Sequence, residues 1–233
     1  MKKIVFFTGA GMSADSGIAT FRDADGLWAN YRIEDVCTPE ALKNNRTQVI
    51  EFYNMRRREV LTKSPNQGHL AIAQMEEWAE VIVITQNVDN LHERAGSKNV
   101  LHLHGELMKL RSERDPKLIY DINEGWEQGL DERAEDGSLL RPHIVFFGES
   151  VPMFDPACRI VEDADVLVVV GTSLAVYPAA MLVRYAKPGV PIYVVDPGSP
   201  DTSMIRNPLT HVKARAAEGM QELADRLMQI YGK

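Results

Sequence analysis

The stretch KIVFFTGAGMSADSG, residues 3–17, decides the fold class of this chain. Its first residues are apolar except for Lys3 and predict a buried strand, and the glycines that follow predict a tight turn into a helix. A strand, a glycine-rich turn and a helix in this order are typical of the start of a nucleotide-binding α/β domain. Because the third glycine of the common GxGxxG spacing is absent, an ordinary dehydrogenase is the least favoured class.

The rest of the chain continues the same alternation. Five more apolar runs predict strands, at 81–85, 100–104, 143–147, 166–170 and 191–195. Amphipathic stretches predict helices, at 47–62, 66–78, 155–163, 178–186 and 216–231. Several strands are apolar at nearly every position, as strands covered by helices on both faces are. We therefore expect an α/β fold with a Rossmann-like, doubly wound parallel sheet.

One segment, 108–141, breaks this alternation, because it is rich in charged residues and has little apolar periodicity. It predicts a small inserted lobe, and a solvated excursion of modest order is the alternative. We expect a single domain over 1–233. Its large Rossmann-like part is expected at about 1–26, 80–107 and 142–233, and its small lobe at about 27–79 and 108–141.

The composition excludes several classes of partner. The chain has 233 residues, 45% of them hydrophobic and 25% charged, with a formal net charge of −7. This acidic balance argues against binding to nucleic acid or to a membrane surface, which needs clustered Lys and Arg. No apolar run approaches the length of a spanning helix or of a secretory signal, so we expect a cytoplasmic protein, and a monomer. The two cysteines, Cys37 and Cys158, are isolated in sequence and predict reduced thiols.

Polar residues follow four of the predicted strands, at the edge of the sheet where such folds bind ligands. Glycines in the first turn suit the approach of a pyrophosphate to backbone N–H groups, although tight turns also use glycine for steric reasons. The amides and carboxylate after the strand at 81–85 suit a ribose or a carboxamide, or cap the next helix. These groups are Gly9, Ala10, Gly11 and Ser13; Gln86, Asn87, Val88 and Asp89; Gly171, Thr172 and Ser173; and Asp196.

Five motifs together resemble the sirtuins, the Sir2 family, and in particular bacterial members. They are GAGMSADSGIATFR, TQNVDNLHERAG, HLHGEL, LLRPHIVFFGE and GTSLAVYPAA, in this order between residues 8 and 180. The resemblance implies an NAD-dependent protein-lysine deacylase that acts on acyl-lysine proteins. Such an enzyme transfers the acyl group to ADP-ribose and releases nicotinamide and 2′-O-acyl-ADP-ribose.

The resemblance also implies roles for particular residues. His104 matches the catalytic histidine and suits proton transfer near neutral pH, whereas His102 is its nearest competitor and His92 packs or caps in its helix. Asn87 would orient the ribose and a water, and Asp89 would accept a hydrogen bond from the nicotinamide carboxamide. The further residues implied for NAD are Gly9, Ala10, Gly11, Ser13, Phe21, Arg22, Gln86, Val88, Gly171, Thr172, Ser173, Asp196 and Ala216.

Substrate choice is expected from Tyr53 and Arg56, which lie three residues apart on one face of a predicted helix. The family's desuccinylase and demalonylase branch carries this YxxR pair, which would bind the carboxylate of a succinyl, malonyl or glutaryl group. Solvated surface charges are the alternative for the arginines. The segment that holds Phe147, Gly148, Glu149 and Val151 would add the substrate peptide as a strand.

One departure from the family concerns zinc. Many sirtuins bind Zn²⁺ through two CxxC pairs in the small lobe, but no cysteine occurs between 104 and 142 here. We expect no zinc and no other metal. Alignment of the flanking motifs puts Ser112, Asp115, Arg133 and Asp136 at the ligand positions. The hypothesis is that an Arg133–Asp115 pair, together with packing by Leu118, Ile119, Tyr120 and Trp126, replaces the metal.

Two other functions remain open on these residues. The same site can transfer ADP-ribose to protein or hydrolyse NAD, which needs no different residues. A non-catalytic module that binds ADP-ribose or acyl-lysine is the other alternative, although His104, Asn87 and Asp89 argue against it.

Overall fold

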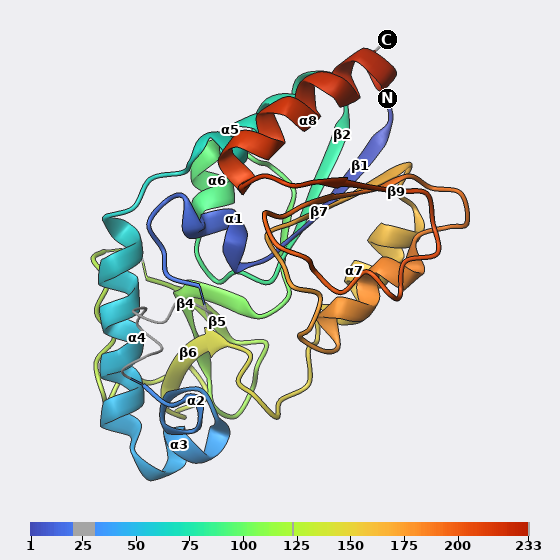
Figure 1. Ribbon diagram of the computed structural model, residues 1–233. Coiled ribbons are helices and arrows are strands. Elements are labelled where there is room, and N and C mark those ends of the chain that lie inside the picture. Colours follow the sequence, from blue (N-terminus) through green and yellow to red (C-terminus); the bar gives the residue numbers. More distant parts are fainter. Residues whose placement is uncertain (21–30, 123, 233) are drawn as a thin grey trace.

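The computed structural model describes residues 1–20, 31–122 and 124–232 (Figure 1). These residues form two sheets, one parallel with six strands and one antiparallel with three. The two ends of the chain lie close together at one end of the molecule. Within the described residues, no helix combines the length and the apolar character needed to cross a membrane.

The parallel sheet confirms the predicted α/β class. Its strands are β1 (Lys3–Thr8), β2 (Glu80–Thr85), β3 (Val100–His102), β7 (Val166–Val170), β8 (Ile192–Val195) and β9 (Leu209–Val212). Their order is β3-β2-β1-β7-β8-β9. The sequence analysis missed β9, whose residues LTHV are only partly buried or exposed at this edge and lack a continuous apolar run.

Helices cover both faces of this sheet, as the continuous apolar strands predicted (Figure 1). Alternate residues of β1 and β7 face opposite ways, so each face has its own apolar cluster. One face packs against α5 (Gln67–Gln74), η2 (Met75–Glu77) and α8 (Ala216–Tyr231). The other packs against α7 (Phe154–Glu162) and η3 (Ala179–Tyr185), so the helix predicted at 178–186 is a 3₁₀ helix.

The order in which the chain adds strands to the sheet reverses between β1 and β7. The chain passes from β1 outward through β2 to β3, and later returns to β7 and continues through β8 to β9. In open parallel sheets, ligands bind in the crevice at this point, outside the carboxyl ends of the strands. The short helix α1 (Ala10–Ala14) follows β1, and α6 (Leu91–Ala95) follows the turn that comes after β2. The fold therefore directs the search for a site to these turns.

The smaller sheet contains β4 (Gly105–Ser112), β5 (Ile119–Asp121) and β6 (Leu140–Ile144), in the order β5-β4-β6. The strand predicted at 143–147 in the parallel sheet is therefore wrong: it begins earlier and pairs antiparallel with β4. The N–H of Val145 donates to the carbonyl of His104, which continues this pairing by one residue, and the N–H of Phe147 donates to the carbonyl of Cys37. Ordered strands within 108–141 favour the lobe over the irregular excursion.

Three helices surround this sheet: α2 (Ile33–Val36), α3 (Pro39–Asn44) and the long α4 (Arg46–Leu61). They share an apolar cluster with β4 and β6. The predicted boundaries between the Rossmann-like part and the lobe stay a prediction. The positions of two elements do not follow them. Helix α5 packs on the parallel sheet, although 27–79 was assigned to the lobe, and β6 begins before 142.

Side-chain hydrogen bonds hold the lobe at the positions that the sequence motifs aligned with zinc ligands. Ser112 Oγ donates to Asp136 Oδ2 at 2.7 Å and accepts from the N–H of Asp115 at 2.9 Å. The predicted Arg133–Asp115 pair is wrong, because Arg133 donates instead to the carbonyl of Gly137 at 2.8 Å. Of the predicted packing residues, Tyr120 contacts the small apolar cluster whereas Ile119 is 44% exposed.

A buried arginine joins α4 to this lobe. Arg57 is fully buried and donates to the carbonyl of Leu107 at 2.7 Å and to Asn54 Oδ1 at 2.8 Å. Asn54 in turn binds the main chain of Gln128 at both its N–H and its carbonyl. Burial lowers the pKa of Arg57 to about 10, although the charge of Glu132 acts in the opposite direction.

Candidate active site

The turns after β1 and β7 meet without side chains between them. The N–H of Gly9 donates to Val170 O at 3.0 Å, and that of Gly11 donates to Gly171 O at 2.8 Å. A Cβ on Gly11 would lie 2.7 Å from the Gly171 Cα, and one on Gly171, at φ +61°, would lie 2.4 Å from Met12 N. The glycines therefore serve close packing of the two turns, and the N–H groups of Gly9 and Gly11 are already used within the protein.

Three predicted residues that follow β1 and β2, Ser13, Asn87 and Asp89, form one hydrogen-bonded cluster. Asn87 Nδ2 donates to Ser13 Oγ at 3.0 Å, and Ser13 Oγ donates to Asp89 Oδ2 at the same distance. Asp89 Oδ1 also accepts from the N–H of Leu91. Asn87 and Asp89 are 8% and 5% exposed, and burial raises the pKa of Asp89 despite these hydrogen bonds. The structure thus brings these side chains together at the predicted edge of the sheet.

The third turn joins the same cluster. Gln86 Nε2 donates to Thr172 Oγ1 at 3.0 Å, which links the turn after β2 to the turn after β7. The carbonyl of Val88 accepts from the N–H of Leu107, so this turn also contacts β4. Hydroxyl, amide and carboxylate groups thus gather at the point where the strand order reverses. They belong to Ser13, Gln86, Asn87, Asp89 and Thr172. Such a donor and acceptor set fits the ribose and carboxamide of a nicotinamide nucleotide.

His104 lies beside this cluster, just after β3. Its Nδ1 is 3.1 Å from the carbonyl of Gln86, which only accepts, so Nδ1 carries the proton. Within the described part of the chain, Nε2 has no hydrogen-bond partner and is the basic nitrogen of a neutral ring. Burial lowers the pKa of His104, partly offset by the Gln86 hydrogen bond. A neutral imidazole with a free basic nitrogen is suited to accept a proton.

The two competing histidines are already engaged. His102 contacts Asn87 O and Glu93 through its two ring nitrogens. His92 Nε2 lies 3.1 Å from Thr8 Oγ1, and the ring is 1% exposed, which agrees with the predicted packing role. Both nitrogens of His102 are occupied, and Nδ1 of His92 has no hydrogen-bond partner among the described residues but lies in a fully buried ring, so the geometry favours His104 as the base.

The remaining described residues predicted for NAD lie in turns and helix starts that follow strands of the parallel sheet. Asp196 follows β8, where its Oδ1 accepts from Gly198 N at 2.8 Å, and the carbonyl of Ser173 accepts from Asp201 N at 3.1 Å. Ala216 begins α8 and is buried, with its carbonyl against Gly68. Ala10 begins α1. Phe21 and Arg22 lie outside the described residues.

Tyr53 and Arg56 lie on the inner face of α4. Tyr53 is 4% exposed, its ring stacks on Phe146 at a centroid distance of 5.8 Å, and its hydroxyl lies 3.3 Å from Cys37 Sγ. The Arg56 side chain is 11% exposed, with Nε 3.8 Å from Glu59 Oε2. Burial strongly raises the pKa of Tyr53, so its hydroxyl stays protonated and can donate. Both side chains thus lie on the buried face, which the alternative of solvated charges does not explain.

The predicted peptide-binding segment is a turn anchored by one carboxylate. Glu149 binds Arg141 Nη1 at 2.6 Å and Arg111 Nη2 at 3.2 Å, and accepts from the N–H of Phe146 at 2.7 Å. Phe147 is 46% exposed and Gly148 has φ +89°. Glu149 therefore fixes this turn against the small sheet with its side chain, a role that its place in the motif did not predict.

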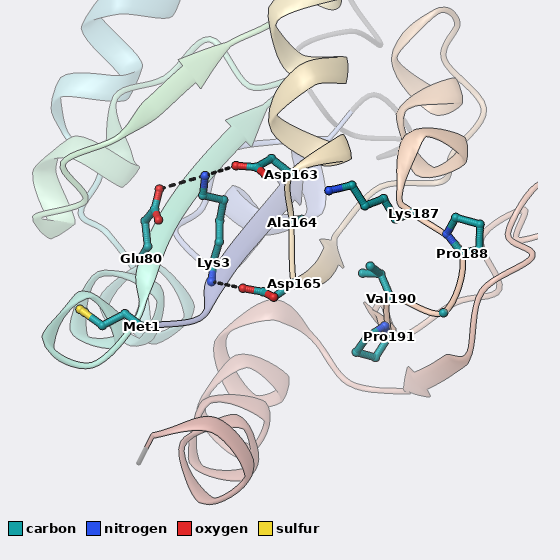
Figure 2. A pocket seen from close by; sticks show the side chains of 11 residues that line it. Met1, Lys3, Glu80, Asp163, Ala164, Asp165, Lys187, Pro188, Val190 and Pro191 are labelled. Carbon is teal, nitrogen blue, oxygen red and sulfur yellow. Dashed lines mark hydrogen bonds and ion pairs between the residues drawn. The ribbon is translucent and has the colours of Figure 1, made fainter.

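A surface pocket lies at the opposite end of the parallel sheet. Figure 2 shows Lys3 between Glu80 and Asp163, with Asp165 accepting from the Lys3 main chain. The pocket has a volume of about 600 Å³. It lies at the amino ends of β1 and β7, away from the turns described above, and its lysine and carboxylates neutralise one another. Ion pairing at the surface accounts for these residues without a ligand.

Comparisons with known proteins agree with this geometry. The model of the Sir2 family matches residues 9–178. An NAD-dependent protein deacylase of Bacteroides thetaiotaomicron is 50% identical over 233 residues, which cover 98% of this chain and 99% of that protein. One of Helicobacter pylori is 46% identical over 232 residues, with 99% of each chain covered.

Solved structures agree as well. A Sir2 homologue in complex with NAD has a TM-score of 0.84 and 39% identity, covering 99% of this chain and 91% of that chain. A Sir2 protein with a deacetylated p53 peptide has a TM-score of 0.74 and 31% identity, covering 98% and 93%. The chain therefore belongs to the Sir2 family. It is an NAD-dependent protein deacylase with a Rossmann-like fold.

Sequence reasoning missed several residues that hold this site together. Thr85 Oγ1 accepts from Asn87 N and from Thr8 Oγ1, and neither threonine was singled out. Cys37 was left without a role, although its thiol contacts Tyr53. The partner of His102 is Glu93, and its place in the HERAG stretch was the only feature of the sequence that could have indicated it. Nothing in the sequence indicated that Cys37 and Tyr53 would meet.

Proposed function

We propose that this deacylase removes acidic acyl groups, succinyl and malonyl, from protein lysines, and acetyl groups as well. The observation that carries the proposal is the burial of Tyr53 and Arg56 on one face of α4. A phenol and a guanidinium that converge on one carboxylate form charge-assisted hydrogen bonds, which a neutral acyl group cannot make. The product would be 2′-O-acyl-ADP-ribose together with nicotinamide.

His104 would act as the general base. Its neutral ring holds the proton at Nδ1 against Gln86, so Nε2 would accept the proton of a ribose hydroxyl. Asn87 would orient the ribose and a water, and Asp89 would accept a hydrogen bond from the carboxamide. NAD supplies the leaving nicotinamide and the ribose that receives the acyl group. Gln86, Ser13, Thr172 and Asp196 would help to bind it.

The protein substrate would lie along the turn that follows β6. Phe147 is exposed there, while its N–H is already used by Cys37 and that of Glu149 by Phe146. Strand addition would therefore use other backbone groups between Gly148 and Val151. The related Sir2 protein with a deacetylated peptide supports a peptide substrate.

A panel of acetyl-, malonyl-, succinyl- and glutaryl-lysine peptides tests the acyl preference. Tyr53→Phe and Arg56→Met should lower kcat/KM on the acidic acyl groups by roughly tenfold to a hundredfold, because each loses a charge-assisted hydrogen bond. Activity on the acetyl peptide should change much less. The matched control is Arg58→Met on the same helix, whose guanidinium lies 5.9 Å from the Trp126 ring centre. Equal losses on acetyl and succinyl peptides would show that the pair supports the fold or the NAD site.

Transfer of ADP-ribose to protein, hydrolysis of NAD, and non-catalytic binding are separated by their products. For a deacylase, nicotinamide release should depend on acylated peptide, and formation of 2′-O-acyl-ADP-ribose should vanish in His104→Ala while NAD binding persists. Release without acylated peptide favours hydrolysis or ADP-ribosyl transfer. No release from the wild type favours a binding module. A cytoplasmic location, a monomer and the absence of nucleic-acid and membrane partners stay predictions.

A further inference from the structure

We infer that His102 and Glu93 form a positioning pair that holds the carbonyl of Asn87 and so fixes the turn that carries the site. The inference rests on the proposed role of Asn87. It adds two residues that do not contact the substrate and act through the backbone. His102 is the last residue of β3, and Glu93 lies in α6. The pair therefore joins these two elements beside the turn that follows β2.

The geometry of His102 requires a charged ring. Its Nδ1 lies 2.9 Å from Asn87 O, and its Nε2 lies 2.8 Å from Glu93 Oε1. A carbonyl and an ionised carboxylate can only accept, whereas a neutral imidazole has a single N–H. Both contacts are satisfied only when both nitrogens carry a proton. His102 is therefore an imidazolium, with 6% of its side chain exposed, paired to a carboxylate that is 39% exposed.

Asn87 is held at three points, and His102 supplies one of them. The main-chain N–H donates to Thr85 Oγ1 at 3.0 Å, and the side-chain amide donates to Ser13 Oγ at 3.0 Å. The carbonyl accepts from His102. The carbonyl one residue earlier, of Gln86, accepts from His104. Two histidines of one segment thus hold consecutive carbonyls, but only the second keeps a free basic nitrogen.

The charges around the pair favour this arrangement. Burial lowers the pKa of His102, but the Glu93 hydrogen bond and charge raise it overall. The same contact lowers the pKa of Glu93 against the opposing effect of its burial. The positive ring also favours the ionised form of the buried Asp89. The titratable groups that face His102 are Glu93 and His92 of α6, Asp89 of the turn, Glu106 of β4 and His143 of β6.

Two substitutions of His102 test the positioning role. His102→Leu removes both hydrogen bonds and should lower kcat by roughly 10- to 100-fold, because a small displacement of a positioned group is costly. KM for the acylated peptide should change less than about threefold, since the peptide does not contact the pair. His102→Asn keeps an N–H near the Nδ1 position and should restore much of kcat. Thermal unfolding of both variants shows whether they fold.

The pH profile of Glu93→Gln separates positioning from simple support of the fold. With Glu93 present, the raised pKa keeps His102 protonated, and the contribution of the pair is lost as pH rises through that pKa. Glutamine has no charge, so the pKa of His102 should fall in this variant. The pH at which kcat declines should therefore be lower than in the wild type. The matched control is Glu76→Gln, a largely buried carboxylate paired with Lys98 away from the site, whose profile should not move.

The outcomes separate this inference from the role on which it rests. An unchanged kcat in His102→Leu, with Asn87→Ala strongly impaired, would overturn the pair but keep the role of Asn87. An unchanged kcat in Asn87→Ala would overturn the role itself, and the inference with it. Equal kcat in His102→Asn and His102→Leu, with an unmoved profile in Glu93→Gln, would assign the pair to stability alone and overturn the inference.

Discussion

The two sheets of this enzyme are stabilised in different ways. Strands β1 and β7 of the parallel sheet are buried almost entirely, and apolar clusters cover both faces. The three-stranded sheet has one small cluster of its own, formed by Leu110, Ala134 and Leu140 with two partly buried neighbours. Around it lie hydrogen bonds and ion pairs of Arg57, Ser112 and Glu149. The parallel sheet thus depends on apolar burial on both faces, whereas the three-stranded sheet combines an apolar cluster shared with α2, α3 and α4 with polar side chains.

This difference shows how the lobe is ordered at Ser112, Asp115, Arg133 and Asp136, the positions that the sequence motifs aligned with the zinc ligands of many sirtuins. Ser112, at one of those positions, binds Asp136 at another and two backbone N–H groups in the same turn. Among the described residues, no group of three or more His, Cys, Asp or Glu could hold a metal ion. A hydrogen-bonded turn and buried contacts to α4 occupy the place of the metal clip.

The largest effect should come from the parallel sheet. Phe6 is fully buried in β1, and Phe6→Ala should lower the free energy of unfolding by about 3–5 kcal/mol because it leaves a cavity in a closely packed cluster. Urea unfolding followed by circular dichroism measures the change. Leu110→Ala in the small cluster is the comparison and should cost less. A larger loss for Leu110→Ala would contradict the assignment of apolar stability to the parallel sheet.

The parallel sheet could be predicted because each strand carries its signal in a few consecutive residues. The run VLVVV gives a buried strand whatever surrounds it, and the glycines that follow require a turn. Strand β9 was missed because it is short and only partly buried. Strand β4 was missed because it depends on contacts with distant segments such as α4, whose Arg57 binds the carbonyl of Leu107, and β5 was missed because it has only three residues, which pair with β4. Periodicity carries no record of such contacts.

In the candidate site, too, some residues could be predicted from the sequence and others could not. The family motifs located His104, Asn87 and Asp89, and the structure brings them to one edge of the sheet. The groups that support them, Thr85 and Glu93 among them, were assigned no role, because a hydrogen bond to a backbone N–H or to a histidine ring leaves no spacing pattern in the sequence. The Arg133–Asp115 hypothesis failed for a related reason: charge complementarity alone does not fix which groups meet.

The second effect concerns the buried arginine. Arg57→Leu should lower the free energy of unfolding by about 2 kcal/mol, because the carbonyl of Leu107 and the amides of Asn54 and Gln128 lose a donor while the cost of burying a cation disappears. Hydrogen exchange should show faster opening of β4 than of β1. Arg58→Leu, one residue along the same helix, is the control and should change little. Uniform loss of protection in both sheets would contradict a separate polar basis for the lobe.

The smallest effect should come from the turn at Ser112. Ser112 is 2% exposed, and Ser112→Ala should cost about 1 kcal/mol, since its hydroxyl joins Asp136, Ser138 and two N–H groups. NAD binding should be unchanged, because the turn lies outside the candidate site. A variant that loses NAD binding would show that the lobe and the site are not independent.

A titration of Asp136 in the same variant shows whether Ser112 acts through this carboxylate. Hydrogen bonds from Ser138 and Ser112 lower the pKa of Asp136 to about 2. Because the folded pKa is below the unfolded value, the contribution of Asp136 is complete above the unfolded pKa and is lost as pH falls toward 2. In Ser112→Ala the pKa should rise toward its ordinary value while Ser138 keeps part of the shift, so the lobe should lose protection at higher pH than in the wild type. NMR titration of the carboxyl carbon measures the rise. An unchanged pKa would mean that Ser138 alone holds the carboxylate, and that Ser112 stabilises the turn only through the backbone.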